Sequence, residues 1–298
     1  MAILALTCAG IVAQSVESES KTVNIATKDK KTRGSSDPLS GLNVALEGQE
    51  MLIGEYHLLI IGIDSYQYWE PLQNAVNDAK EIHNTLEEKY KTDNIITLYN
   101  QEATRANIIK AFEDLRNAVS ENDNVMIYFS GHGEYVGNPP KGYWVPVDSK
   151  KKSSADYIST ADIKTFISEI NSKHIFLIAD ACYSGDVFRG NTVSIPYENS
   201  ERYYNTVHNK RSRSALTSGD IEKVMDAGRD GHSVFAYYLL KELNRNDKRY
   251  LDASELYNAI KIPVFNNSEQ SPRFAPLKNT GDEGGQFIFI QKSALENE

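Results

Sequence analysis

The chain has 298 residues, of which 40% are hydrophobic and 10% aromatic, and this is enough for one main globular domain with an appendage. The formal net charge of −9 disfavours a nucleic-acid-binding protein, because no concentrated basic stripe is present to contact phosphates. The two cysteines, Cys8 and Cys182, could form one disulfide, but their spacing fits neither a disulfide framework nor a metal site.

The N-terminal region divides into an apolar stretch and a polar one. Residues 1–13 are apolar apart from Thr7, which leaves two alternatives: a signal peptide with a truncated start and a cut near Ala13, or a short apolar tail. The first implies an exported protein, periplasmic or secreted, and the second a cytoplasmic one. The stretch is short for a membrane span. Residues 14–55 are polar and lack periodicity, so we expect a linker or pro-segment there, followed by a folded domain over 56–292.

Predicted strands and helices alternate from the start of this domain. His57–Ile63 is nearly all apolar, as in a strand covered on both faces, and Leu72–Leu86 has apolar residues at helical spacing. A second strand is predicted over 94–98, a second helix over 104–119 and a third strand over 124–129.

The same alternation continues through the middle of the chain. Residues 143–147 are predicted to be a strand or hairpin arm away from the sheet centre, because Pro146 lacks the N–H that a central strand needs. A helix capped by Ser159 is predicted over 159–170, and the apolar run that begins at His174 is the fourth strand. Residues 186–213 are polar and are predicted to be a long loop.

The C-terminal part adds further elements of both kinds. A fifth strand is predicted over 214–218, helices over 232–243 and 251–260, and a last strand over 286–290. His232 and Asp252 are the expected caps of the two helices. This alternation predicts an α/β domain with a mostly parallel sheet.

Two of the buried strands are followed by reactive side chains. The third strand leads into Ser130-Gly-His132-Gly133, and the fourth into Asp180-Ala-Cys182-Tyr-Ser-Gly. Because a parallel sheet presents the carboxyl ends of its strands at one edge, His132 and Cys182 are expected to meet there. A lone cysteine is more commonly a small core residue, but this position suits a nucleophile. His132 would deprotonate Cys182 and then protonate a leaving amine, while the N–H groups of Gly133 and Cys182 bind the oxyanion.

These motifs resemble the caspase-haemoglobinase group of cysteine peptidases, and within it the caspase-like orthocaspases and metacaspases of bacteria, of the peptidase C14 type. The resemblance extends over roughly 56–290 and includes Ala215–Gly219 and Gly231–Phe235. It implies a three-layer sandwich with a central, mostly parallel, six-stranded sheet flanked by helices. It also implies a cysteine endopeptidase, and we expect this chain to need no cofactor.

The resemblance further implies a pocket for a basic side chain. Metacaspase-like proteins have acids at the positions of Asp78 and Asp180 and a serine at that of Ser130. Two carboxylates in one pocket favour a cation, so we expect cleavage of protein or peptide substrates after arginine or lysine. Simpler alternatives are that Asp180 caps the next turn, that Asp78 lies on a solvated helix edge and that Ser130 is only a turn residue. The remaining histidines of the predicted strands and loop are expected at strand ends or on the surface; they are His57, His174 and His208.

Five basic residues are candidates for self-cleavage in the predicted loop, as in the cut between large and small subunits of caspase relatives. They are Arg189, Arg202, Lys210, Arg211 and Arg213. The alternative is a solvated surface loop. Many metacaspases have an acidic calcium cluster, where this chain has Ser159-Thr-Ala-Asp162 and Arg189, so no metal site is expected.

Two other classes of function compete with a peptidase. A catalytically silent caspase-like scaffold would bind partners, but the presence of both His132 and Cys182 disfavours it. A nucleotide-binding domain is disfavoured because no glycine-rich phosphate loop opens a helix. The sequence does not choose between a monomer and a dimer.

Overall fold

The computed structural model describes residues 51–138, 141–181, 201–219 and 228–295. They belong to the second of two compact units, which spans Glu47–Glu298. The predicted signal peptide at 1–13, most of the predicted pro-segment, Cys182 and Arg189 lie outside the described residues. Within the described residues, no helix is both long enough and apolar enough to cross a membrane.

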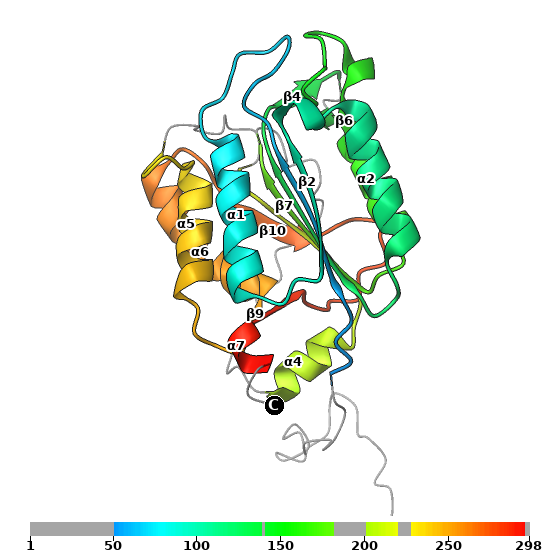
Figure 1. Ribbon diagram of the computed structural model, residues 1–298, viewed down its shortest axis with the longest axis vertical. Helices are drawn as coiled ribbons and strands as arrows, with labels where there is room; N and C mark the ends of the chain where they lie inside the picture. Colours follow the sequence, from blue (N-terminus) through cyan, green and yellow to red (C-terminus); the bar gives the residue numbers. More distant parts are fainter. Residues whose placement is uncertain (1–50, 139–140, 182–200, 220–227, 296–298) are drawn as a thin grey trace, which may run out of the picture. The chain divides into compact units, whose positions relative to one another are not determined.

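A six-stranded sheet forms the centre of the domain, with the strand order β10-β8-β7-β3-β1-β2 (Figure 1). Five neighbouring strands run parallel, and only β10 is antiparallel to its neighbour β8. The strands are β1 Tyr56–Gly62, β2 Asn94–Tyr99, β3 Asn124–Ser130, β7 His174–Asp180, β8 Ser212–Thr217 and β10 Arg273–Pro276. Every residue of β1, β3, β7 and β8 is buried, as expected where helices cover both faces.

Helices cover both faces of the sheet and make it a three-layer sandwich (Figure 1). Helices α1 (Ala75–Lys89), α5 (Val234–Arg245) and α6 (Ala253–Asn267) lie on one face, and α2 (Arg105–Ala118) and α3 (Thr160–Glu169) lie on the other. The predicted α/β fold with a mostly parallel, six-stranded sheet is therefore confirmed.

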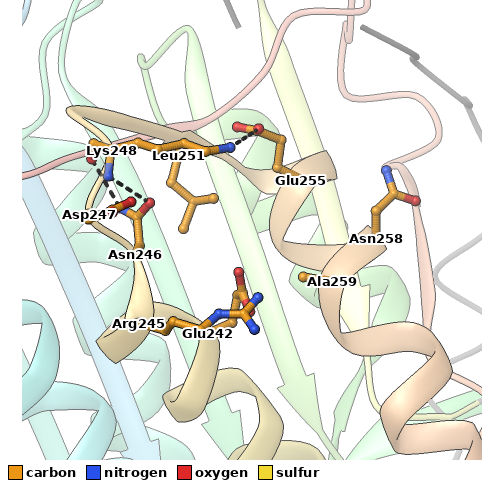
Figure 2. A pocket seen from close by; sticks show the side chains of 9 residues that line it. All are labelled: Glu242, Arg245, Asn246, Asp247, Lys248, Leu251, Glu255, Asn258 and Ala259. Atoms are coloured by element: carbon orange, nitrogen blue, oxygen red, sulfur yellow. Dashed lines mark hydrogen bonds and ion pairs between the residues drawn. The ribbon is translucent and has the colours of Figure 1, made fainter. Parts of the chain in front are cut away.

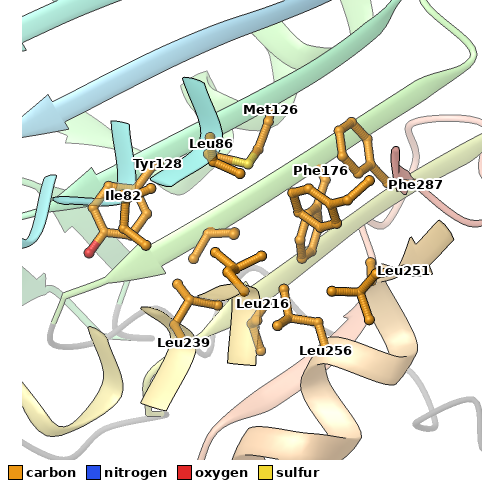
Figure 3. Packing of buried hydrophobic residues seen from close by; sticks show 14 of the residues in the cluster. Ile82, Leu86, Met126, Tyr128, Phe176, Leu216, Leu239, Leu251, Leu256 and Phe287 are labelled. Carbon is orange, nitrogen blue, oxygen red and sulfur yellow. The ribbon is translucent and has the colours of Figure 1, made fainter. Parts of the chain in front are cut away.

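Alternate residues of each strand enter separate hydrophobic cores. On the α1 side, Tyr128 and Phe176 pack with residues such as Leu239 of α5 (Figure 3). On the α2 side, Phe129 and Leu177 pack with residues such as Ile163 of α3. Even-numbered residues of β3 and β7 thus face α1, and this parity decides which polar residues meet at the strand ends.

Smaller elements surround the main sheet. A three-stranded sheet contains β4, β5 and β6, and a two-stranded one contains β9 and β11. Their bounds, with those of the remaining helices, are β4 Gly133–Val136, β5 Lys141–Trp144, β6 Ile158–Ser159, β9 Tyr250–Asp252, β11 Ile288–Ile290, α4 Glu201–His208 and α7 Lys292–Leu295, and short 3-10 helices span Asn100–Glu102 and Ser154–Asp156.

Several local predictions hold and others are wrong. Ser159 and Asp252 cap α3 and α6, each with a reciprocal capping box. His232 is not a cap, because Ser233 holds that position and its Oγ accepts a hydrogen bond from the N–H of Ala236. The predicted strand at 286–290 is observed as β11, which pairs with β9 outside the main sheet. The edge of the main sheet beside β8 is β10, a short strand that ends in proline.

The predicted loop over 186–213 is wrong in its second half. Glu201–His208 is the helix α4, and Ser212 and Arg213 begin β8. Because Arg213 is buried within a paired strand, it is not exposed on a loop.

His174 is the first residue of β7 and so lies at a strand end, as predicted, but none of the three histidines discussed above is on the surface: His57, His174 and His208 are all buried. His174 and His208 stack with their ring centroids 4.2 Å apart. Nε2–H of His174 donates to the carbonyl of His208 over 2.6 Å, and Nε2–H of His208 donates to the carbonyl of Leu52 over 3.1 Å. Desolvation, followed by the neighbouring His208, lowers the pKa of His174 to about 3, and burial also lowers the pKa of His208. The two rings therefore have a structural role: their stacking and the hydrogen bond between His174 and His208 connect the end of α4 to the start of β7.

Candidate active site

The loop after β3 holds His132 in a fixed orientation. Its backbone N–H donates to the hydroxyl of Tyr66 over 2.7 Å, and its Nε2–H donates to the carbonyl of Glu70 over 2.8 Å. The rings of Tyr66 and Trp69 lie 4.7 and 5.4 Å from the imidazole ring. Since a carbonyl only accepts, Glu70 fixes the proton on Nε2 and leaves Nδ1 as the nitrogen that can accept a proton.

A side chain at Gly131 would disrupt this arrangement. A Cβ added there would lie 2.5 Å from the Tyr66 hydroxyl, which is closer than packing permits. The glycine before His132 therefore permits the close approach of Tyr66. The sequence reasoning missed Tyr66, Trp69 and Glu70, although their aromatic-rich segment follows β1 and so leaves the same edge of the sheet.

The chain that enters Cys182 leaves the sheet beside the histidine loop. Strands β3 and β7 are parallel neighbours, and Ser130 pairs with Asp180 at their last position. The N–H of Gly131 donates to the carbonyl of Asp180 over 3.4 Å, and the buried Ala181 follows. Cys182 is the next residue and lies outside the described part of the chain. The two motifs thus start from the same end of adjacent strands, and the oxyanion role of Gly133 and Cys182 stays a prediction.

The two predicted pocket acids come together on the α1 side of this edge. Asp78, in the first turn of α1, is 0% exposed, and Asp180, at the end of β7, is 2% exposed. Ser233 bridges them: its N–H donates to Asp78 over 3.2 Å, and its Oγ–H donates to Asp180 over 2.5 Å. Asp78 also accepts a hydrogen bond from Nδ1–H of His232 over 2.7 Å. The alternative that placed Asp78 on a solvated helix edge is wrong.

Tyr128 and Ser130 lie on the face of β3 that is turned towards α1, the same side of the sheet as these carboxylates. Ser130 is 3% exposed and pairs in register with Asp180. Burial raises the pKa of Tyr128 well above its usual value, and the negative charges of Asp78 and Asp180 raise it further. The Tyr128 hydroxyl is therefore close enough to both carboxylates for their charges to act on it, as expected if Asp78 and Asp180 form a single acidic site.

The basic residues proposed for self-cleavage have different settings. Arg202 is in α4, and Lys210 and Arg211 are in the turn between α4 and β8. The guanidinium of Arg213 donates to the carbonyls of Ile167, Ile170 and Ser172 over 2.8–2.9 Å. Arg213 therefore has a structural role that disfavours cleavage after it in the folded protein.

The described residues include a pocket away from the acidic site but no cluster suited to a metal ion. No group of three or more His, Cys, Asp and Glu residues is arranged there to hold a metal ion. A polar pocket of about 490 Å³ lies between the C-terminal end of α5 and α6 (Figure 2). Four of its charged side chains form ion pairs with one another, Arg245 with Glu242 and Lys248 with Glu255. Because Ser233 precedes the other end of α5, this pocket is separate from the acidic site by the length of the helix.

Comparison with known proteins identifies the family of the chain. The caspase domain model of the C14 peptidases matches residues 56–282. Metacaspase-1 of Saccharomyces cerevisiae is 27% identical over 166 residues, which are 50% of this chain and 37% of that protein. Metacaspase-1B of Aspergillus oryzae is 29% identical over 149 residues, which are 44% of this chain and 35% of that protein.

Among solved structures, protein GSU0716 from Geobacter sulfurreducens has a similar fold. It superposes with a TM-score of 0.54 at 16% identity, covering 78% of this chain and all of that one. The alignments with the curated relatives cover only a little over a third of those proteins. The family match covers most of this chain, including His132, Cys182 and the two predicted pocket acids. The chain therefore belongs to the caspase domain family, the C14 group of cysteine peptidases.

Proposed function

We propose that the protein is a cysteine endopeptidase that uses a His132–Cys182 dyad and cleaves after arginine or lysine. The observation that carries the proposal is the pair of buried carboxylates, Asp78 and Asp180, joined by Ser233 at the strand edge where the histidine loop begins. A buried pair of acids is unfavourable unless donors or a cation compensate it. A lysine or arginine side chain of a substrate would supply that charge, and arginine can bind two carboxylates at once.

The chemistry would follow from the fixed orientation of His132. Nδ1 takes the thiol proton of Cys182, and the thiolate attacks the scissile carbonyl carbon. The N–H groups of Gly133 and Cys182 stabilise the oxyanion of the tetrahedral intermediate. His132 then gives its proton to the leaving amine, which departs and leaves a thioester. Water, deprotonated by His132, hydrolyses the thioester and restores the thiol. The carbonyl of Glu70 stabilises the imidazolium that forms in each half of the reaction.

Self-processing is a second part of the proposal. The basic P1 preference makes Arg189, Arg202, Lys210 and Arg211 the candidates, since Arg213 is built into the β-sheet. A cut after one of these residues would separate a large N-terminal fragment from a small C-terminal one. Residues 14–50 would be a removable pro-segment, and export would depend on residues 1–13.

Hydrolysis of fluorogenic peptides tests the proposed activity. Peptides that end in arginine, lysine or aspartate are compared on the wild type, on Cys182→Ala and on Cys8→Ala as the matched cysteine control. We expect cleavage after arginine and lysine in the wild type and in Cys8→Ala, and none in Cys182→Ala. A folded wild type that cleaves no peptide would instead support the scaffold alternative.

Intact-mass measurement tests self-processing on the same proteins. We expect fragments from the wild type that end at one of the four basic residues, and an intact chain from Cys182→Ala. A wild type that stays intact while it cleaves peptides would contradict self-processing and leave the peptidase proposal standing.

A further inference from the structure

His232 and Ser233 lie just before α5 and belong neither to the dyad nor to the two predicted pocket acids. Both contact those acids. Nδ1–H of His232 donates to Oδ1 of Asp78, and Ser233 donates to Asp78 through its N–H and to Asp180 through its hydroxyl. These contacts join residues 154, 155 and 53 positions apart in the sequence. The segment is therefore a specific tertiary partner of the acidic site.

Two neighbouring buried carboxylates tend to share a proton, because like charges repel strongly away from water. A site with only one negative charge would attract a cation less well. Donors directed at each carboxylate oppose this tendency by favouring the ionised form. Ser233 supplies such a donor to each acid, and the positive N-terminal end of the α5 dipole lies beside them.

The direction of the Ser233 hydroxyl proton is fixed by its second role. As the N-cap of α5, Oγ accepts a hydrogen bond from the N–H of Ala236 over 2.9 Å. Because that contact uses a lone pair of Oγ, the single proton of the hydroxyl is left to be donated to Asp180. The serine is also 3% exposed, so water does not readily replace this donor.

A second contact holds the turn that carries these residues. The side-chain amide of Asn77 donates to the carbonyl of Gly231 over 2.9 Å, so a hydrogen bond from α1 holds the turn next to Asp78. Because a carboxylate only accepts, the proton of the His232 contact is on Nδ1. His232 therefore orients Asp78, while Ser233 couples Asp78 to Asp180.

We propose that Ser233, supported by His232, is a positioning residue that keeps Asp78 and Asp180 ionised together, so that the pocket selects a cationic P1 side chain. This inference rests on the proposed function and adds to it a residue outside both catalytic motifs. Ser233 acts through the two acids and does not itself contact the reacting atoms.

The test replaces the hydroxyl while retaining the helix cap. Ser233→Gly removes Oγ but keeps the N–H to Asp78, and glycine is nearly as good as serine at an N-cap. Ser233→Thr keeps the hydroxyl and serves as the rescue variant. Thr104→Ala removes the N-cap of α2 on the other face of the sheet and controls for loss of a cap. Each protein is assayed from pH 5 to 9 on paired peptides with arginine or citrulline at P1, which differ in charge and hardly in shape.

We expect Ser233→Gly to lower kcat/KM on the arginine peptide about tenfold, mostly through KM, which corresponds to about 1.4 kcal/mol. The citrulline peptide should change little, and the acidic limb of the arginine profile should move to higher pH as one carboxylate takes a proton. Ser233→Thr and Thr104→Ala should behave as the wild type.

The inference is overturned if Ser233→Gly keeps the wild-type preference for arginine and the same acidic limb, or if it loses both peptides equally. A wild type that cleaves arginine and citrulline peptides alike would overturn the proposed specificity, and this inference with it. If the wild type prefers arginine and Ser233→Gly has the same preference and the same pH profile, the inference about Ser233 is overturned and the proposed specificity stands. Calorimetry of arginine-peptide binding to Cys182→Ala, with and without Ser233→Gly, gives a second measurement that does not depend on turnover.

Discussion

The buried histidine at the start of β7 makes the stability of the domain depend on pH in a defined window. His174 is 1% exposed, and its pKa falls to about 3 in the folded protein from 6.5 in an unfolded chain. Between these values the unfolded chain binds a proton that the folded protein does not, so the free energy of unfolding falls as pH decreases from about 6.5 towards 3. At pH 5, about 1.5 pH units below the pKa of the unfolded chain, the free energy of unfolding is lower by roughly 2 kcal/mol than at neutral pH. Above pH 7.5 this contribution to the pH dependence vanishes.

Urea unfolding at pH 7.5 and pH 5.0 measures this effect, in a Cys182→Ala background so that no self-cleavage intervenes. His174→Gln removes the titrating ring and keeps a donor. We expect the stability difference between the two pH values to be about 2 kcal/mol smaller in His174→Gln than in the parent. An equal pH dependence in the parent and in His174→Gln would refute the reasoning.

Two further predictions concern the histidine loop and the start of β8. Tyr66→Phe removes the hydroxyl that accepts a hydrogen bond from the N–H of His132. In steady-state kinetics it should lower kcat on an arginine peptide about tenfold with little change in KM. A rise in KM of about tenfold in place of the fall in kcat would assign Tyr66 to substrate binding. Arg213→Met leaves three carbonyls without their donor, so it should reduce the free energy of unfolding, measured by urea titration, by about 3 kcal/mol. The fragments that mass spectrometry detects should be the same as in the wild type. Loss of one fragment in Arg213→Met would show that the chain is cut there after all.

The sheet, and the edge at which the chain leaves it towards His132 and Cys182, were predictable because their signals are local. An unbroken apolar run marks a strand such as β3 or β7, and the residues that follow it leave the sheet at a known edge. Helix caps such as Ser159 and Asp252 are likewise encoded within three residues. The edge strand β10 lacked such a signal, because it is short and contains proline.

The contacts that complete the site depend on tertiary structure. Glu70 contributes a backbone carbonyl, which no side-chain pattern reveals. Ser233 had a readable signal as a serine before an amphipathic helix, but its donors reach acids on two other elements. The burial of His174 and His208 was also unpredictable, since only the fold stacks a strand start against the end of α4.

The pairing of β7 with β8 inside the main sheet affects what a cut between them would do. The strands pair in parallel over six positions, and Arg213 of β8 holds carbonyls of the segment that precedes β7. A nick in the intervening connection would leave a heterodimeric particle that migrates as one species under native conditions and as two bands in denaturing gels. Asp78 and Asp180 would then belong to one polypeptide and Ser233 to the other, so the proposed specificity pocket would need both polypeptides of the heterodimer.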